Sequence, residues 1–394
     1  NLDFDIDEMY AKNSVYDGVG YSLPETVVTN DDLTKLYETS DEWIYSRTGI
    51  KERRLVSGEE NAIDLGFKAA KNAIEKAGIN PEEIDLILAA SSAPPDLYPA
   101  IACHIHKRLE ISKPVPAFDI TAACSGLIYG LSIAKAYIAS GMYKNILIVA
   151  TDNNSRLLDW TDRGTSILFG DGAGAMVVTQ AEDGVDDIIA IDIKADGNFG
   201  HLIELPFSGK NCPLVEPNEV QPAGIKMNGR GVYTFVAKVL PQYVEQLLAD
   251  AGVSAGEIDY LIPHQANMRI IQAVQERLGY SDEKVISNIK YYGNTSAASI
   301  PIAMAEGVEK GKVKLPSTAV LCGFGSASTF VTTGNFASER LNSDTKPSNS
   351  LPAFSMNLEW NAPETAKGTT FLTPAAFNNS EAFATASLSP VITT

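Results

Sequence analysis

The chain has 394 residues, of which 45% are apolar and 20% are charged, the balance of an ordinary water-soluble folded protein. Its 31 Lys and Arg residues against 49 Asp and Glu residues give a net charge of −18 at pH 7, which argues against a nucleic-acid binder and against docking on an anionic membrane. No apolar run approaches the roughly 20 residues of a membrane span, and the acidic start is unlike a signal peptide.

Helical and strand periods alternate from about residue 15 to residue 336, which predicts an α/β protein. Two helices and two buried strands are predicted in the first half, the helices over residues 63–77 and 127–140 and the strands over residues 86–90 and 146–150. Because these short strands lack polar alternation, we expect a sheet that is covered on both faces.

The chain also repeats itself. Residues 77–88 (AGINPEEIDLIL) and 251–262 (AGVSAGEIDYLI) are identical at five of twelve positions, without a gap and at an offset of 174. Passages of this kind share composition by chance in α/β proteins, but the ungapped identity favours an internal duplication. We therefore expect two similar halves, residues 15–182 and 183–337, related by a pseudo-twofold axis, with a ligand site between them.

Residues 338–394 have a different character. They carry five prolines, many Ser, Thr and Asn residues, and little periodicity, which predicts an irregular C-terminal extension.

The number and spacing of the cysteines indicate the redox state of the compartment in which the protein works. The chain has four, none of them in a CxxC pair, and four are too few for a disulfide framework at this length. We expect free thiols in a reducing, cytoplasmic setting. Each thiol is then either a small apolar filler or a reactive group.

Cys124 is the strongest candidate for a catalytic nucleophile. It follows a strand-like stretch, residues 117–120, and precedes a helix that is predicted to start near Ser125. Unpaired N–H groups and the dipole at a helix N-terminus favour the thiolate, and the small neighbours Ala122 and Ala123 leave room for a substrate. The alternative is a buried cysteine that fills a strand–helix corner, and the segment alone favours neither.

His264 and Asn294 favour the reactive interpretation. His264 follows the second copy of the duplicated strand, and open α/β folds build their sites at the carboxyl ends of sheet strands. Asn294 precedes another small-residue helix, so its context mirrors that of Cys124. This side chain can cap the helix or donate to a developing oxyanion.

Other candidates are weaker. His104 and His106 are poorly spaced for one metal ion and are interpreted as partly exposed helix residues. His201 lies in a Gly-rich loop, and its role stays open. The glycines at 170–174 run into a strand rather than a helix, so this stretch is interpreted as a tight turn and not as a nucleotide-binding loop.

Residues 15–336 resemble β-ketoacyl-acyl-carrier-protein synthase III, the chain-initiating condensing enzyme of the thiolase superfamily. The fold of that family is a duplicated five-layer αβαβα sandwich, in agreement with the repeat. The resemblance rests on seven stretches in the family's order, namely Thr39-Ser-Asp-Glu-Trp-Ile, Arg47-Thr-Gly-Ile, Ala122-Ala-Cys-Ser-Gly, Thr161-Asp-Arg-Gly-Thr, Phe169-Gly-Asp-Gly-Ala-Gly-Ala, Pro263-His-Gln-Ala-Asn and Gly293-Asn-Thr-Ser-Ala-Ala-Ser.

The resemblance implies a role for each catalytic candidate. Cys124 takes an acyl group from a coenzyme A or carrier-protein thioester, and its own N–H helps to hold the oxyanion. His264 and Asn294 stabilise the enolate that forms when a malonyl thioester loses carbon dioxide, and this carbanion attacks the acyl-Cys124 thioester. Neutral donors suit a growing negative charge, which a carboxylate would repel. No metal or redox cofactor is implied.

Further roles are implied around this centre. Those residues are Trp43, for stacking on adenine; Arg163, for adenine or phosphate; Asn267, as the support of His264; Arg269, near the entrance; and Tyr98, which reaches into the partner subunit in family dimers. Arg47 belongs to a basic island at residues 47–54, which can receive phosphates or an acidic carrier protein or can be a solvated loop.

The chain departs from the family pattern at residues 323–330. The family commonly has a glycine run, a bulky apolar residue and then Thr-Trp-Gly, whereas Ser326, Ala327 and Ser328 interrupt the run here. Ser328 is expected to open and wet the site, so that a larger starter group or a reaction without decarboxylation becomes conceivable. The segment 196–225 is expected to shape the acyl pocket.

The leading hypothesis is therefore a decarboxylating Claisen condensation that gives a β-ketoacyl thioester. A second is an acyltransferase to an oxygen or nitrogen nucleophile through the same cysteine. A papain-like peptidase also has Cys, His and Asn in this order, but the signature expected around its cysteine is absent. An inactive partner subunit is the last alternative.

Overall fold

The strands build two main sheets that have the same order and the same directions. The computed structural model describes residues 14–181, 186–206, 224–325 and 328–336. Within these residues the first sheet has the order β1-β7-β6-β4-β5 and the second has the order β8-β13-β12-β11. In each sheet the first three strands are antiparallel and the fourth is parallel to the third. Where β5 extends the first sheet, a parallel bridge between Leu261 and Val285 extends the second.

The elements have the following bounds. The strands are β1 Ser14–Ser22, β2 Val27–Thr29, β3 Glu52–Arg54, β4 Leu86–Ala90, β5 Ala117–Ile120, β6 Asn145–Asp152, β7 Gly172–Gln180, β8 Ala190–Ala195, β9 Ile203–Glu204, β10 Lys226–Met227, β11 Tyr260–Pro263, β12 Ser317–Gly325 and β13 Ser328–Phe336. The α-helices are α2 Asn30–Leu33, α3 Asp41–Thr48, α4 Ala62–Ala77, α5 Ile101–Arg108, α6 Gly126–Ala139, α7 Arg163–Ser166, α8 Gly229–Asp250, α9 Met268–Leu278, α10 Ile289–Tyr292 and α11 Ser299–Glu309. The 3-10 helices are η1 Pro81–Glu83, η2 Ala123–Ser125, η3 Asn154–Arg156, η4 Gly197–Leu202, η5 Ala255–Glu257, η6 Asp282–Lys284 and η7 Ser296–Ala298.

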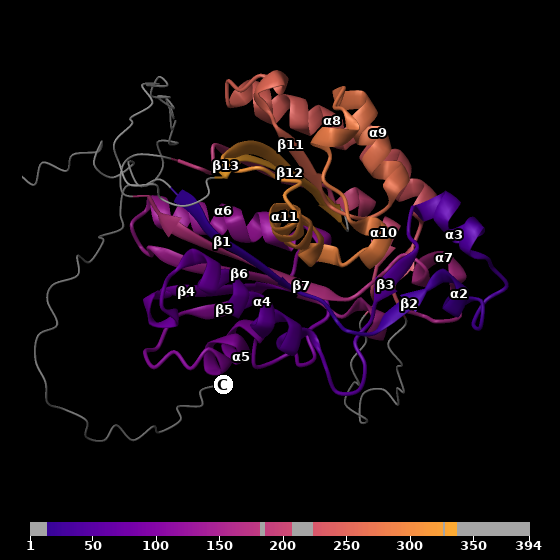
Figure 1. Ribbon diagram of the computed structural model, residues 1–394, viewed down its shortest axis with the longest axis horizontal. Coiled ribbons are helices and arrows are strands. Elements are labelled where there is room, and N and C mark those ends of the chain that lie inside the picture. Colours follow the sequence, from indigo (N-terminus) through magenta and orange to yellow (C-terminus); the bar gives the residue numbers. More distant parts are fainter. Residues whose placement is uncertain (1–13, 182–185, 207–223, 326–327, 337–394) are drawn as a thin grey trace, which may run out of the picture. The chain divides into compact units, whose positions relative to one another are not determined.

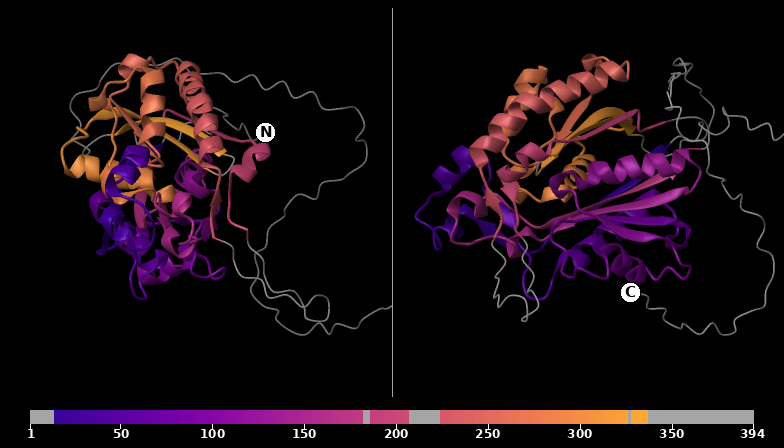
Figure 2. Two further views of the ribbon diagram at one scale, coloured as in Figure 1. Left: turned by 90° about the vertical axis from the view of Figure 1, so that its right-hand side faces the viewer. Right: turned by 180° about the vertical axis from the view of Figure 1, so that it is seen from behind.

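Helices cover both faces of each sheet, so the elements stack in five layers (Figures 1 and 2). Helices α4 and α5 pack on the outer face of the first sheet, and α8 packs with α9 on the outer face of the second. Helices α6 and α11 lie between the sheets and contact both of them. The prediction of a duplicated αβαβα sandwich is confirmed. Three apolar clusters fill the spaces between these layers, in keeping with a strand such as β4 that is buried along its whole length.

The sequence repeat is also a structural repeat. A left-handed glycine ends or follows the helix in each copy, with φ of +67° at Gly78 and +66° at Gly252. A short 3-10 turn comes next, and a capping box closes it in both copies, with Glu83 in η1 and Glu257 in η5. We propose that the two sheets are the two predicted halves of the chain.

Some predictions lie outside the described residues. These are the irregular extension at 338–394, the free thiol expected at Cys212, and most of the segment 196–225 that is expected to shape the acyl pocket. Over the part of the chain that is described, no helix is both long and apolar enough to cross a membrane.

Candidate active site

Cys124 lies in η2, the turn that connects β5 to α6, as the strand–helix pattern predicts. The turn begins at Ala123, a non-glycine residue with φ of +46°, a strained conformation that persists only where its surroundings fix it. Part of that fixing comes from β12, because a Cβ added to Gly325 would lie 2.9 Å from the Cβ of Cys124. Cys124 keeps partial solvent access, and the Ser296 hydroxyl lies 3.6 Å from its Sγ.

The Cys124 thiol is neutral in the free protein. Burial raises its pKa to about 12, and the nearby Asp152 carboxylate also raises it, while the hydrogen bond from Ser296 acts in the opposite direction. This direction is opposite to the one expected from a helix terminus, because the effect of burial is larger than that of the turn's N–H groups. The proton must leave the thiol during the reaction.

His264 follows β11 and is only 1% exposed. Its backbone N–H donates to the Cys322 carbonyl at 2.7 Å, and its Nδ1 lies 2.7 Å from the Ser299 hydroxyl. Burial lowers the pKa of the imidazole to about 3, so the ring is neutral at physiological pH. When the Ser299 hydroxyl donates to Nδ1, Nε2 carries the single ring proton and can donate it to a ligand.

Asn294 is held on both sides by backbone. Its N–H donates to the Leu168 carbonyl at 2.8 Å, and its carbonyl accepts from the Gly170 N–H at 3.0 Å. Its Oδ1 accepts from the Ser296 N–H at 2.8 Å. That bond fixes the amide orientation, so the Nδ2 end is the donor that Asn294 can offer to a ligand. The cap and the donor roles are thus compatible, because they use opposite ends of one amide.

A single segment, residues 294–299, brings the three candidates together. It carries Asn294 itself, Ser296 against the Cys124 thiol and Ser299 against the His264 ring. Strand β12 lies on the other side, where a Cβ added to Gly323 would be 3.9 Å from both the Cys124 carbonyl oxygen and the His264 Cβ. The arrangement offers one nucleophile and two neutral hydrogen-bond donors, the set needed to form an acyl thioester and to stabilise an oxyanion.

A second group of predicted residues forms a cluster at α3, α7 and α9. The guanidinium carbons of Arg47 and Arg163 each lie 4.3 Å from the centre of the Trp43 ring, within the range of a cation–π contact. Two side chains at the start of α9 donate to backbone carbonyls of α3. Asn267 donates to the Arg47 carbonyl at 3.2 Å, and Arg269 donates to the Ser46 carbonyl at 2.9 Å. The structure thus unites five residues that were predicted for substrate binding.

Two details of the predicted binding residues are wrong. Asn267 does not support His264: its Oδ1 caps α9 by accepting from the Arg269 N–H, and the partner of the His264 ring is Ser299. The basic island is also not one exposed patch. Arg53 is 1% exposed and donates to Asn30 and to the Ile167 carbonyl, because it is part of the core beside β3.

Two other predicted residues stand apart. Tyr98 is 86% exposed in the loop before α5. Ser328 is the first residue of β13, where the structure describes the backbone only, so its predicted effect on the site lies outside the described side chains.

The sequence analysis missed three residues of this centre, Ser296, Ser299 and Asp152. The two serines lie in the same stretch as Asn294, but a serine in a small-residue segment carries no signal of its own. Asp152 ends the buried strand β6. A polar residue at the carboxyl end of a strand was the signal that identified His264, and it could have identified Asp152 as well.

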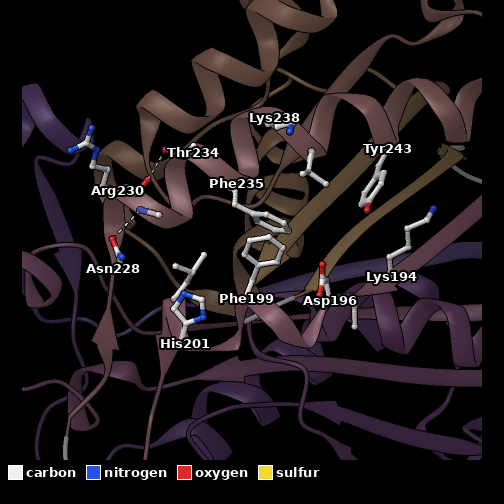
Figure 3. Close-up of a pocket in the computed structure, with 14 residues that line it drawn as sticks. Lys194, Asp196, Phe199, His201, Asn228, Arg230, Thr234, Phe235, Lys238 and Tyr243 are labelled. Atoms are coloured by element: carbon white, nitrogen blue, oxygen red, sulfur yellow. Dashed lines mark hydrogen bonds between the residues drawn. The ribbon is translucent and has the colours of Figure 1, made fainter.

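A separate hollow lies between η4 and α8 (Figure 3). Phe199 and Phe235 face each other at its centre, with ring centroids 4.4 Å apart. The basic side chains Lys194, Arg230 and Lys238 stand around them. Among the described residues, its lining does not include Cys124, His264 or Asn294, so we treat it as a distinct surface feature.

Comparisons with known proteins agree with this geometry. Two family models match, 3-oxoacyl-[acyl-carrier-protein] synthase III over residues 118–197 and its C-terminal part over residues 248–333. The chain is 43% identical over 313 residues to β-ketoacyl-[acyl-carrier-protein] synthase III of Clostridium acetobutylicum, covering 79% of this chain and 95% of the relative. It is 44% identical over 324 residues to the chloroplastic enzyme of Arabidopsis thaliana, covering 79% of this chain and 80% of that protein.

Solved structures give the same result. The chain is similar to 3-oxoacyl-[acyl-carrier-protein] synthase III of Aquifex aeolicus, with 42% identity and a TM-score of 0.75 over 82% of this chain and all of that one. It is also similar to the priming β-ketosynthase of the R1128 polyketide pathway, with 31% identity and a TM-score of 0.76 over 83% of this chain and 97% of that one.

Proposed function

The chain belongs to the β-ketoacyl-[acyl-carrier-protein] synthase III family, and from this premise we propose that Cys124, His264 and Asn294 are its catalytic residues. The reaction is a decarboxylating Claisen condensation that starts a fatty-acid or polyketide chain. The observation that carries the assignment is the segment 294–299, which contacts both the thiol and the imidazole.

In the first half-reaction the Cys124 sulfur attacks the carbonyl carbon of an acyl thioester. The tetrahedral intermediate places a negative charge on the former carbonyl oxygen, and the Cys124 N–H at the start of the helix is a donor for it. Collapse expels the sulfur of the donor as a thiolate, which takes up a proton, and leaves an acyl thioester on Cys124. The partial exposure of this residue supports access by a substrate.

In the second half-reaction a malonyl thioester loses carbon dioxide. The electron pair of the broken C–C bond remains on the thioester and forms an enolate. His264 and Asn294 donate to the enolate oxygen. Since burial keeps the imidazole neutral, this donor can stabilise the charge without giving up its proton to the product. The carbanion then attacks the acyl carbon, and the Cys124 thiolate leaves.

Coenzyme A thioesters are proposed to bind at the Trp43 cluster. The Trp43 ring already contacts the two guanidinium groups of Arg47 and Arg163, and an adenine ring can take the place of one of them. The displaced guanidinium then becomes available to the phosphates of the ligand.

The partners remain proposals. Because Arg53 is buried and Lys51 is paired with Asp41, we propose that an acidic carrier protein binds instead at the basic side chains around the hollow, Lys194, Arg230 and Lys238. A homodimer that covers the exposed Tyr98 is proposed as the assembly. The free thiols of Cys103, Cys124 and Cys322 support a reducing compartment.

The test is intact-protein mass spectrometry after incubation with a panel of acyl-coenzyme A thioesters. We expect the mass of one acyl group on wild-type protein, mapped to Cys124 by peptide analysis. No acyl mass with any thioester would contradict the proposal. Release of carbon dioxide from malonyl thioester separates condensation from the alternative of acyl transfer to oxygen or nitrogen, in which none is released.

A further inference from the structure

Asp152 is a buried carboxylate next to the nucleophile, and the mechanism above gives it no role. It ends β6 and has no solvent exposure. Its Oδ1 is well satisfied, since it accepts from the Ser92 N–H at 2.7 Å, from the Ala93 N–H at 3.1 Å and from the Ser91 hydroxyl at 3.1 Å. Its Oδ2 is equally buried but is left without a fully formed hydrogen bond among the described residues. A buried polar atom without a full hydrogen bond is uncommon in folded proteins, so this oxygen needs an explanation.

Ser296 lies between this carboxylate and the thiol. Its Oγ is 3.6 Å from the Cys124 Sγ. Strand β6, which ends at Asp152, packs against η7, which begins at Ser296. The Ser296 hydroxyl and the Ala297 N–H act against burial and lower the pKa of the Asp152 carboxyl group. The position of Ser296 is fixed, because its N–H donates to Asn294 and its φ is +54°, in the left-handed region.

A serine hydroxyl has one proton to donate and two lone pairs with which to accept. It can therefore donate to the sulfur, or it can accept from the thiol and donate to the carboxylate. The second arrangement directs the proton from the Cys124 S–H through the Ser296 O–H toward Oδ2 of Asp152, the oxygen that has no fully formed hydrogen bond among the described residues.

We propose that Asp152 takes up the Cys124 proton through Ser296 when the thiol attacks the acyl donor, and returns it when the thiolate is released. This inference rests on the proposed function. In acylation the S–H proton passes to Ser296 Oγ while the Ser296 proton passes to Asp152 Oδ2, so a neutral carboxylic acid and a sulfur nucleophile form together. The new C–S bond forms, the C–S bond of the donor breaks, and the expelled thiolate takes a proton from water.

In condensation the same path runs backwards. The carbanion forms a C–C bond to the acyl carbon, the C–S bond to Cys124 breaks, and the thiolate recovers the proton from Asp152 through Ser296. Each cycle thus ends with a neutral thiol and an ionised carboxylate, as at its start.

The charges at the site fit this exchange. Burial raises the pKa of Asp152 to about 6, which leaves the carboxylate ionised at neutral pH yet a better base than an ordinary aspartate. The thiol itself is a weak acid here and needs such an acceptor. His264, whose ring contacts the same segment through Ser299, stays neutral over the working range of pH because of its own burial.

The experiment measures the single-turnover rate of Cys124 acylation between pH 5 and pH 9, by rapid quenching and intact mass. For the wild type we expect the rate to rise with pH to a plateau, with a midpoint near 6. In D152N and in S296A we expect a rate about 100-fold lower at pH 7.5, the usual contribution of a positioned base, and no midpoint near 6. S296A removes only a hydroxyl, so it carries the test if D152N fails to fold.

D171N is the matched control, because Asp171 is also fully buried and bonded to serine and backbone groups but belongs to the loop before β7. It should keep the midpoint of the wild type. A wild-type midpoint that persists in D152N and S296A would overturn the relay, even if their rates were lower, since a merely structural role changes the rate without removing the titration. Wild-type protein that never acquires an acyl group would instead overturn the proposed function.

Discussion

The two turns that enter the central helices, η2 and η7, have the same construction but different chemistry. Each begins with a non-glycine residue of positive φ, Ala123 in the first and Ser296 in the second. The second residue of the turn is Cys124 in one half and Ala297 in the other. The duplicated backbone therefore supplies two equivalent corners, and only one of them carries a nucleophile.

The ends of the equivalent strands in the two sheets also carry different residues. At the offset of the repeat, His264 after β11 corresponds to Ala90 at the end of β4. The ends of β6 and β12 cross over, so that β6 packs against η7 and β12 packs against η2. Gly325 at the end of β12 leaves space for Cys124, whereas Asp152 at the end of β6 brings a carboxylate to Ser296. The duplicated fold thus gives the two halves equivalent positions, and under the proposed function each half contributes different groups to one reaction.

The largest effect should come from removing the nucleophile. C124A is expected to lose acylation by about 10⁴-fold or more, as measured by intact mass, because no other group at the site can form the thioester. C103A, a change at an exposed cysteine, should leave the rate unchanged.

The same experiment sharpens the comparison of the two turns. C124A/A297C moves the thiol to the equivalent corner, where the residue is fully buried, and should not restore acylation. Restored acylation in the double variant would show that the two corners are interchangeable.

Removing the imidazole should separate the two half-reactions. H264A is expected to retain most of its self-acylation but to lose decarboxylation of malonyl thioester by about 10²- to 10³-fold, the usual cost of an oxyanion donor. Acylation is measured by mass and decarboxylation by carbon dioxide release. Equal losses in both would assign His264 as the base for Cys124, against the division of roles proposed here.

Filling the space at the end of β12 tests the crossing of the two halves. In G325A the new Cβ would lie 2.9 Å from the Cβ and 3.0 Å from the N atom of Cys124, so the turn must shift. We expect a loss of about 1–3 kcal/mol in the free energy of unfolding and slower acylation. G197A, where a Cβ meets nothing within 4 Å, is the control for the change of residue type. Unchanged stability in G325A would mean that the close packing is not required.

The smallest predicted effect is a pH dependence of stability. The pKa of His264 is about 3 in the folded protein and about 6.5 when unfolded, so the unfolded chain binds the extra proton between these values. This group therefore costs stability as pH falls below 6.5, by about 1.4 kcal/mol for each pH unit. Chemical denaturation at pH 5.5 and pH 7.5 should show a smaller difference in H264Q than in the wild type. An equal difference would indicate that His264 titrates normally.

Much of the fold could be predicted from the sequence because its signals are local. The periodic apolar pattern at residues 63–77 became α4, one residue longer, and the apolar run at 86–90 became β4 with the same bounds. The repeat predicted the paired sheets because each copy has a left-handed glycine at or just after the end of its helix and a glutamate that closes the following turn.

The parts that could not be predicted depend on contacts between distant segments. The sequence shows a helix terminus near Cys124. The burial of Cys124, which raises the pKa of its thiol, comes from the packing of β12 and η7 against η2. The family resemblance implied that Asn267 supports His264, yet Ser299, 35 residues away in the chain, makes that contact. Charge alone likewise did not show that Arg53 is enclosed by β2 and the loop before β7.

Cys124 in one half and His264 and Asn294 in the other are proposed to act on the same acyl group, and a single chase of the acyl-enzyme tests this coupling most directly. Wild-type protein loaded at Cys124 is mixed with malonyl thioester, and the acyl mass on the protein is followed together with released carbon dioxide. We predict one carbon dioxide for each acyl group lost and a β-ketoacyl thioester as the product. Loss of the acyl group without carbon dioxide, or carbon dioxide without loss of the acyl group, would contradict a common centre for Cys124, His264 and Asn294.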